Sequence, residues 1–75
     1  DGSVQQVVSY LKKEYLIDPL SYQPIEWSPV QQVNDGYWVR HQHRARNSFG
    51  GYVVMDQVFH LNMDGKVDRV QDYIK

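Results

Sequence analysis

The segment Tyr37–Leu61 decides the fold, and its sequence is YWVRHQHRARNSFGGYVVMDQVFHL. Two runs of strand-like composition flank a short polar segment, Asn47–Gly51, that contains two glycines. Successive side chains of a strand point to opposite faces, so residues two apart share a face. A connection of this length, in which Asn and Gly can supply positive φ, is typical of a β-hairpin. The segment therefore predicts a long hairpin with two distinct faces.

The register of this hairpin follows from matching the apolar positions of its two runs around Phe49. A shift by one residue would move every side chain to the wrong face, so a single register is favoured. We predict an odd-numbered, mainly apolar face with the pairs Tyr37–Leu61, Val39–Phe59, His41–Gln57, His43–Met55 and Ala45–Val53. The even-numbered face then contains the pairs Trp38–His60, Arg40–Val58, Gln42–Asp56, Arg44–Val54 and Arg46–Tyr52. On that face Asp56 is expected within reach of its diagonal neighbours Arg40 and Arg44.

One helix is expected before the hairpin. Apolar residues recur at helical spacing from Val4 to Tyr15, which predicts a helix over that range. Its β-branched valines give it little intrinsic helix propensity, so its stability should depend on docking. The odd-numbered face of the hairpin is the apolar surface on which it can dock.

Further strands are expected on either side of the hairpin. An irregular edge strand is predicted within Ser21–Val33, because Pro24 and Pro29 each remove a donor from the ladder. After the turn at Asn62–Gly65, residues 66–75 suit either a strand or one or two helical turns, and we favour a strand. The fold class is therefore α+β, with an N-terminal helix packed on one face of a three- or four-stranded antiparallel meander.

Length and composition narrow the possible functions. The 75 residues carry a net charge of −1 and include no cysteine. They suit one domain, residues 1–75, without disulfides or thiolate metal sites, and without a general attraction to nucleic acid or anionic membranes. No apolar run approaches the roughly 20 residues that a membrane-spanning helix needs. Because nucleophile elbows, phosphate-binding glycine loops and zinc-protease motifs are also missing, we predict no enzyme activity, catalytic residue or cofactor.

Two motifs resemble those of an uncharacterised family of small bacterial domains. One is Tyr-x-Val-Arg-His-x-x-Arg-Ala-x-Asn-Ser-Phe-Gly-Gly-Tyr-Val, from Tyr37 to Val53, and the other is Asp-Pro-x-Ser-Tyr, from Asp18 to Tyr22. Members of that family are short secreted or lipoprotein-attached modules that often follow a membrane anchor. The resemblance implies an extracytoplasmic location, in the periplasm or cell envelope. It implies no substrate, cofactor or active residue, and this chain has no cysteine that could be lipidated.

The even-numbered face of the hairpin is the candidate functional surface. It would present aromatic, basic and apolar side chains opposite a complete apolar face. Trp, Tyr and Arg are enriched among the residues that dominate protein interfaces, although a solvated face with cross-strand Arg–Tyr and Arg–Asp pairs would have the same composition. We therefore predict a non-catalytic protein-interaction module that binds another protein or a neighbouring domain of a longer parent chain. The candidate contact residues are Trp38, Arg40, Arg44, Arg46, Tyr52, Val54 and Val58.

Single-stranded nucleic acid is a less favoured ligand of the same face. Arginines interleaved with aromatic residues can contact phosphates and stack on bases. An acidic residue, Asp56, lies within the stripe, and the chain lacks the basic character that usually marks such proteins. The residues concerned would be Trp38, Arg40, Arg44, Arg46 and Tyr52.

Metal binding is a second alternative. His41 and His43 share the odd-numbered face and could together bind zinc or copper. A zinc site needs at least one more strong ligand, and the remaining histidine, His60, is expected on the other face. The competing interpretation is that both histidines lie at a partly buried rim beneath the helix, hydrogen-bonded to Gln57, Tyr10 or the backbone.

Overall fold

In the computed structural model, which describes residues 3–73, the predicted hairpin consists of β3 (Gly36–Arg46) and β4 (Tyr52–Leu61). The strands are antiparallel, and the predicted pairs are present from one end to the other, which confirms the register. The Asn47 N–H donates to the Gly51 carbonyl across the turn, with an N–O distance of 2.8 Å. Gly50 supplies the positive φ, 82°, that the turn needs.

Three shorter strands complete the sheet, namely β1 (Gln23–Trp27), β2 (Gln31–Val33) and β5 (Val67–Asp72). Within the described residues the sheet is antiparallel with the order β1-β3-β4-β5, and β2 also pairs with β3. β1 and β2 lie one after the other along β3, separated by Pro29, and a bulge follows Pro24. The α+β fold class is confirmed. The described strands number five because the predicted edge strand is divided in two.

β5 shows that the segment after the Asn62–Gly65 turn is a strand, as we favoured. Val67 lies opposite Leu61, and Val70 lies opposite Phe59. A step of two residues along β4 thus matches a step of three along β5, because a bulge accommodates the extra residue. This bulge explains why the two valines break strict alternation and yet both pack against the core. Ile74, the next apolar position of the pattern, lies outside the described residues.

The helix lies where the sequence predicts it, but its last part differs in type. α1 (Ser3–Tyr10) is α-helical, whereas the following segment Leu11–Tyr15 is π-helical. The prediction of a helix from Val4 to Tyr15 is therefore confirmed, with the addition that its last five residues are of the π type. The Leu16 N–H donates to the Leu11 carbonyl, five residues back, at 2.8 Å, and Leu16 itself is extended. The wider turn is thus the point at which the chain leaves the helix.

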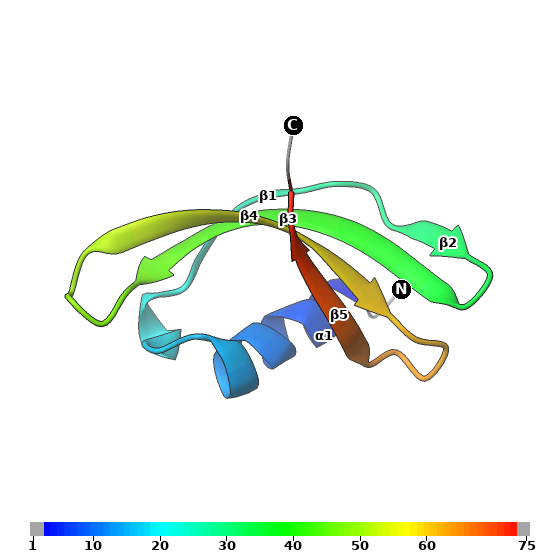
Figure 1. Ribbon diagram of the computed structural model, residues 1–75, viewed down its shortest axis with the longest axis horizontal. Coiled ribbons are helices and arrows are strands. Elements are labelled where there is room, and N and C mark those ends of the chain that lie inside the picture. The colour runs from blue at the N-terminus through cyan, green and yellow to red at the C-terminus, as the bar shows by residue number, and fades with distance from the viewer. Residues whose placement is uncertain (1–2, 74–75) are drawn as a thin grey trace.

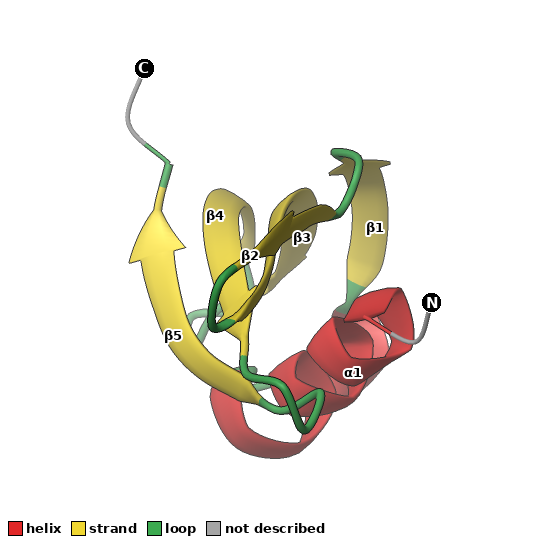
Figure 2. Ribbon diagram, turned by 90° about the vertical axis from the view of Figure 1, so that its right-hand side faces the viewer, coloured by secondary structure: helices red, strands yellow, loops and turns green. Residues whose placement is uncertain are grey.

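The helix covers one side of the sheet. Figure 1 shows the sheet as an arch with α1 beneath its concave side, and Figure 2 shows the helical segment on that side from a second direction. The concave side carries the odd-numbered face of the hairpin, as predicted. The helix of the described region is too short and too polar to cross a membrane. The fully buried apolar cluster consists of Val7, Leu11, Val39, Phe59 and Leu61.

The start of β3 offers a test of this packing. A Cβ added at Gly36 would lie 1.8 Å from the Leu61 carbonyl oxygen, and Gly36 has a φ of +150°. Gly36→Ala should therefore lower the free energy of unfolding by at least about 2 kcal/mol, through overlap and backbone strain. Urea unfolding followed by tryptophan fluorescence measures the loss.

Gly51→Ala is the matched control. A Cβ at Gly51 would meet only the Asn47 Oδ1 atom, at an ordinary distance of 3.9 Å. Its free energy of unfolding should stay within about 0.5 kcal/mol of the parent value. Equal losses for the two substitutions would contradict the close contact between β3 and the end of β4.

Candidate functional site

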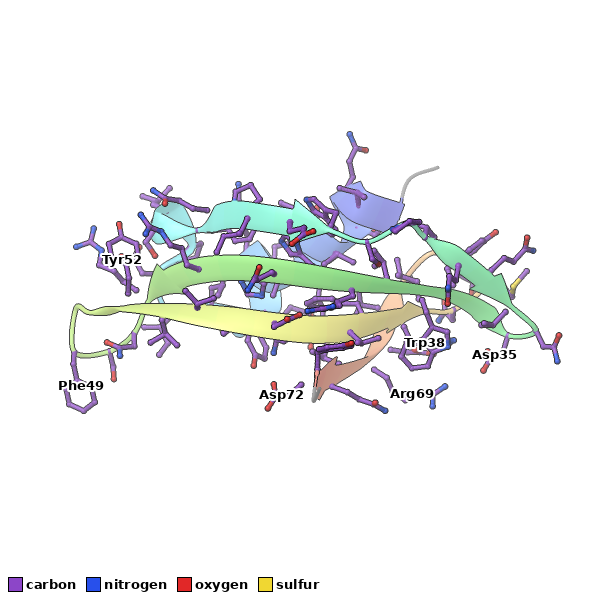
Figure 3. The ribbon with its side chains drawn as sticks, turned by 90° about the horizontal axis from the view of Figure 1, so that it is seen from above. Asp35, Trp38, Phe49, Tyr52, Arg69 and Asp72 are labelled. Carbon is purple, nitrogen blue, oxygen red and sulfur yellow. The ribbon has the colours of Figure 1, made fainter. Side chains whose placement is uncertain are left out.

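The even-numbered face of the hairpin is the convex side of the sheet, seen from above in Figure 3. The confirmed register places all of the candidate contact residues on this face. Val54 and Tyr52 have exposed fractions of 57% and 50%, whereas Trp38 and Val58 are half-buried. Figure 3 shows Tyr52 near the hairpin turn and Trp38 at the opposite end of the face. We call the region around Tyr52 the tip end. We call the region around Trp38 and its strand partner His60 the His60 end.

At the tip end, two arginines are organised around one tyrosine. The Arg44 Cζ atom lies 4.8 Å from the centre of the Tyr52 ring, and the Arg46 Cζ atom lies 5.9 Å from it. Arg44 Nε also donates to the Gln23 side-chain carbonyl at 2.7 Å. Cation–π contacts and a neighbouring strand thus hold these guanidinium groups in place beside the exposed Val54. Among the described residues Arg44 has no acidic partner.

In the middle of the face the positive charge is neutralised within the chain. Arg40 binds Asp56 through two hydrogen bonds, from Nε at 2.8 Å and from Nη2 at 2.5 Å. This contact confirms the predicted diagonal pair, and it raises the pKa of Arg40 above its ordinary value. The ring of Tyr73 covers the same guanidinium at 3.6 Å. Arg40 is therefore less available to a partner than Arg44.

At the other end of the face, His60 lies between two carboxylates. The prediction that it faces away from His41 and His43 is confirmed, but its side chain is only 1% exposed. Its Nδ1 atom hydrogen-bonds to Asp68, and its Nε2 atom lies 3.1 Å from Asp35 Oδ1. Trp38 covers the ring, with 4.7 Å between ring centres, and the Arg69 guanidinium lies over Trp38. Trp38 is thus engaged within the protein.

The two carboxylates determine the charge of His60. An imidazolium can donate from both nitrogens, whereas a neutral imidazole can satisfy only one of the two contacts. The hydrogen bond to Asp68, and then that to Asp35, raises the pKa of His60 above its ordinary value of about 6.5, although its burial opposes the shift. The two acids face opposite ring nitrogens, so the three side chains do not converge on one point.

The other two histidines lie on the concave side and are fully buried. His41 Nδ1 donates to the Glu26 carbonyl at 2.8 Å, which leaves Nε2 to accept from the Tyr22 hydroxyl at 2.6 Å. The expected position at a partly buried rim is therefore wrong: both side chains are 0% exposed, and the Tyr22 and Phe59 rings pack against both of them. The expected backbone partner is present, but the phenol comes from Tyr22 and not from Tyr10, and Trp27 stacks on His41 with ring centres 3.4 Å apart.

His43 is tied into a short relay of hydrogen bonds. Its Nε2 atom lies 2.9 Å from the side-chain oxygen of Gln57, as predicted, and Gln57 Nε2 donates to the Tyr15 hydroxyl at 3.0 Å. Burial lowers the pKa of His43, and it lowers that of His41 to about 4. The same effect raises the pKa of Tyr22 to about 12, so this hydroxyl remains a donor to His41. Both imidazoles are therefore neutral at pH 7.

This bonding bears on the metal hypothesis. Both nitrogens of His41 are already hydrogen-bonded, and in the described part of the chain only the Nδ1 atom of His43 is buried without a partner. A zinc site needs three or four strong ligands. Between residues 3 and 73 no group of three or more histidine, aspartate or glutamate side chains is arranged to hold a metal ion. The hydrogen bonds of His41 and His43 that the structure shows are thus all to groups of the protein.

Searches of protein-family models, curated proteins and solved structures find no significant match to the chain.

Three residues at the His60 end were not anticipated, namely Asp35, Asp68 and Arg69. Asp35 belongs to a turn and Asp68 to the bulged strand β5, so no periodic pattern links them to His60. The sequence contains one indication of this cluster, the predicted Trp38–His60 pair, which places a histidine beside an aromatic ring. The predicted turns Asn34–Gly36 and Asn62–Gly65, which each contain an aspartate, lie close to this pair in the sequence.

The histidines should titrate in two opposite directions. Ring signals followed by NMR from pH 3.5 to 9 should give His60 a pKa above 6.5, His43 a pKa below 6.5 and His41 a pKa of about 4. For His60 the folded state binds the proton more tightly, so stability is present below the unfolded pKa and declines as pH rises through the folded pKa. For His41 and His43 the unfolded state binds more protons, so stability falls as pH drops below about 6.5.

His60→Gln separates the two effects. The variant should lose the alkaline decline in the free energy of unfolding between pH 6.5 and 9, while the acid decline stays. If His60 titrates at or below 6.5 in the parent protein, the imidazolium bound by two carboxylates is not the state that the protein adopts.

Proposed function

We propose that the chain is a non-catalytic protein-interaction module whose partner binds the tip end of the convex face. The observation that supports this proposal is the exposed Val54 and Tyr52 on a regular, uncovered sheet face, flanked by two ordered arginines. Exposed apolar side chains grouped with Tyr and Arg are typical of interface centres. The contact residues are Arg44, Arg46, Tyr52 and Val54, which we call the tip surface.

The charge of the tip surface indicates the chemistry of its partner. Arg44 has no acidic partner among the described residues, and Arg46 has one long contact, with 3.4 Å between its Nε atom and Asp18 Oδ2. An acidic side chain beside an apolar residue on the partner would pair with Arg44 and cover Val54 in the same contact. Such complementarity favours specificity and a fast encounter.

The remaining candidate residues, Trp38, Arg40 and Val58, are engaged with other parts of the protein. Trp38 packs on His60, Arg40 pairs with Asp56, and Val58 lines a hollow together with Tyr73. These contacts are internal, so we assign the partner contact to the other four candidates. An extracytoplasmic location, which the family resemblance implies, belongs to the same proposal and would place the partner in the cell envelope.

Site-specific photo-cross-linking tests the proposal directly. The full chain with p-benzoylphenylalanine in place of Val54 is irradiated in cells that produce the protein. We expect a covalent adduct with one protein of defined mass. Arg44→Glu in the same chain should lower the adduct yield about tenfold, because it opposes an acidic partner.

Benzoylphenylalanine at Lys13, an exposed position on the outer side of the helical segment, is the control and should give no such adduct. Equal adducts at both positions, or none at position 54, would refute the proposal. An adduct that nuclease treatment shortens would identify nucleic acid as the ligand of this face and would also overturn it.

A further inference from the structure

The concave side of the sheet is not covered along its whole length. The hairpin extends past the end of the helical segment toward its turn (Figure 1). A groove of about 280 Å³ lies there between the two. The helical side contributes Tyr15, Leu16 and Ile17, and the odd-numbered face of the hairpin contributes Ala45, Val53 and Met55.

The groove lies where the apolar face of the hairpin continues beyond the core, and no side chain of the described residues fills it. Val53 lies on the same face as Phe59, yet Val53 is 40% exposed and Phe59 is fully buried. The reason is that the π-helical segment ends at Tyr15 and the chain turns away at Leu16. On the opposite wall Ile17 is 70% exposed. Two apolar walls therefore face each other across a recess, which suits a narrow apolar ligand better than a flat protein surface.

The inner end of the groove is held in place by the buried polar relay. The Tyr15 hydroxyl accepts a hydrogen bond from Gln57, which in turn binds His43. Tyr15 is 44% exposed, so one side of its ring lines the groove while its hydroxyl is fixed below the sheet. This wall of the groove is thus already ordered before a ligand binds, which lowers the entropic cost of binding.

One charged residue lines the groove among the residues described, and it is Arg46. Its Nε atom lies 3.4 Å from Asp18, the residue after Ile17, so the guanidinium reaches over the edge of the strand toward the helical wall. This contact is long and involves only Nε. In the described part of the chain the two terminal nitrogens of Arg46 have no hydrogen-bond partner.

We propose that this groove binds a monocarboxylate with a medium-length alkyl chain. The alkyl chain lies between Ile17 and Val53, and the carboxylate accepts hydrogen bonds from the terminal nitrogens of Arg46. Paired donors of this kind suit a carboxylate geometrically. The volume is at the small end of ligand pockets, about 300–1,000 Å³, which excludes large lipids.

A titration with decanoate tests the proposal. Two-dimensional NMR of the full chain, recorded below the aggregation concentration of the probe, should show saturable shifts at Ile17, Val53 and Met55. Decyltrimethylammonium, which has the same alkyl chain and the opposite charge, should not bind at the same concentration. Arg46→Gln should weaken decanoate binding about tenfold or more, through loss of a charge-assisted contact.

Two neighbouring valines provide a matched pair of variants. Val53→Trp fills the groove and should abolish decanoate binding, whereas Val54→Trp lies on the convex face and should leave it unchanged. The second variant alters the tip surface, so this pair also distinguishes the groove from the proposed protein contact. Equal binding of both probes, shifts scattered over the whole surface, or decanoate binding that survives Val53→Trp would each overturn the proposal.

Discussion

The antiparallel pairing of β3 with β4 is the constraint on which the rest of the structure depends. It places Val39, His41 and His43 beneath the sheet and Arg40 and Arg44 above it. A slip of one residue would bury guanidinium groups without partners, at a cost of several kcal/mol each. The helical segment would also lose the apolar surface on which it docks. Its own helix propensity is weak, so the loss would destabilise it. The edge strands, the open face and the groove are all positioned by this one register.

The same register gives the three histidines two different chemical roles. Beneath the sheet, His41 and His43 are neutral and act as buried polar packing groups, each tied to a named partner. On the convex side, His60 favours the charged form because two carboxylates face it. An unsatisfied buried polar group costs about 1–3 kcal/mol, so the polar part of the core specifies its geometry more strictly than an apolar core of the same size would.

Sequence reasoning predicted the hairpin well because a long alternating pattern has only one register that buries Val39, Phe59 and Leu61 together. It predicted the position of the helix for the same reason, since Val7 and Leu11 recur at helical spacing. It could not predict the π-helical end, where backbone hydrogen bonds span five residues in place of four, or the bulge in β5, where one extra residue breaks the alternation.

The sites themselves were less accessible from the sequence. Which residues share the even-numbered face could be predicted from the alternation of side chains along a strand alone. The cluster around His60 joins a turn, a central strand and a bulged edge, and the groove arises from the difference in length between the hairpin and the helical segment. Both depend on how elements that are distant in the sequence pack against each other, and local sequence patterns do not predict such packing. The internal pairing of Arg40, in contrast, followed from the diagonal geometry of antiparallel strands.

Backbone NOEs between β3 and β4 in solution are the most direct measurement of the central claim. The two-faced hairpin predicts interstrand contacts that link Val39 to Phe59, His41 to Gln57 and Ala45 to Val53. Hα–Hα or HN–HN contacts that link Val39 to Val58 or to His60 in place of Phe59 would show a register shifted by one residue. That result would place the wrong side chains on each face and contradict the core, the open surface and the groove together.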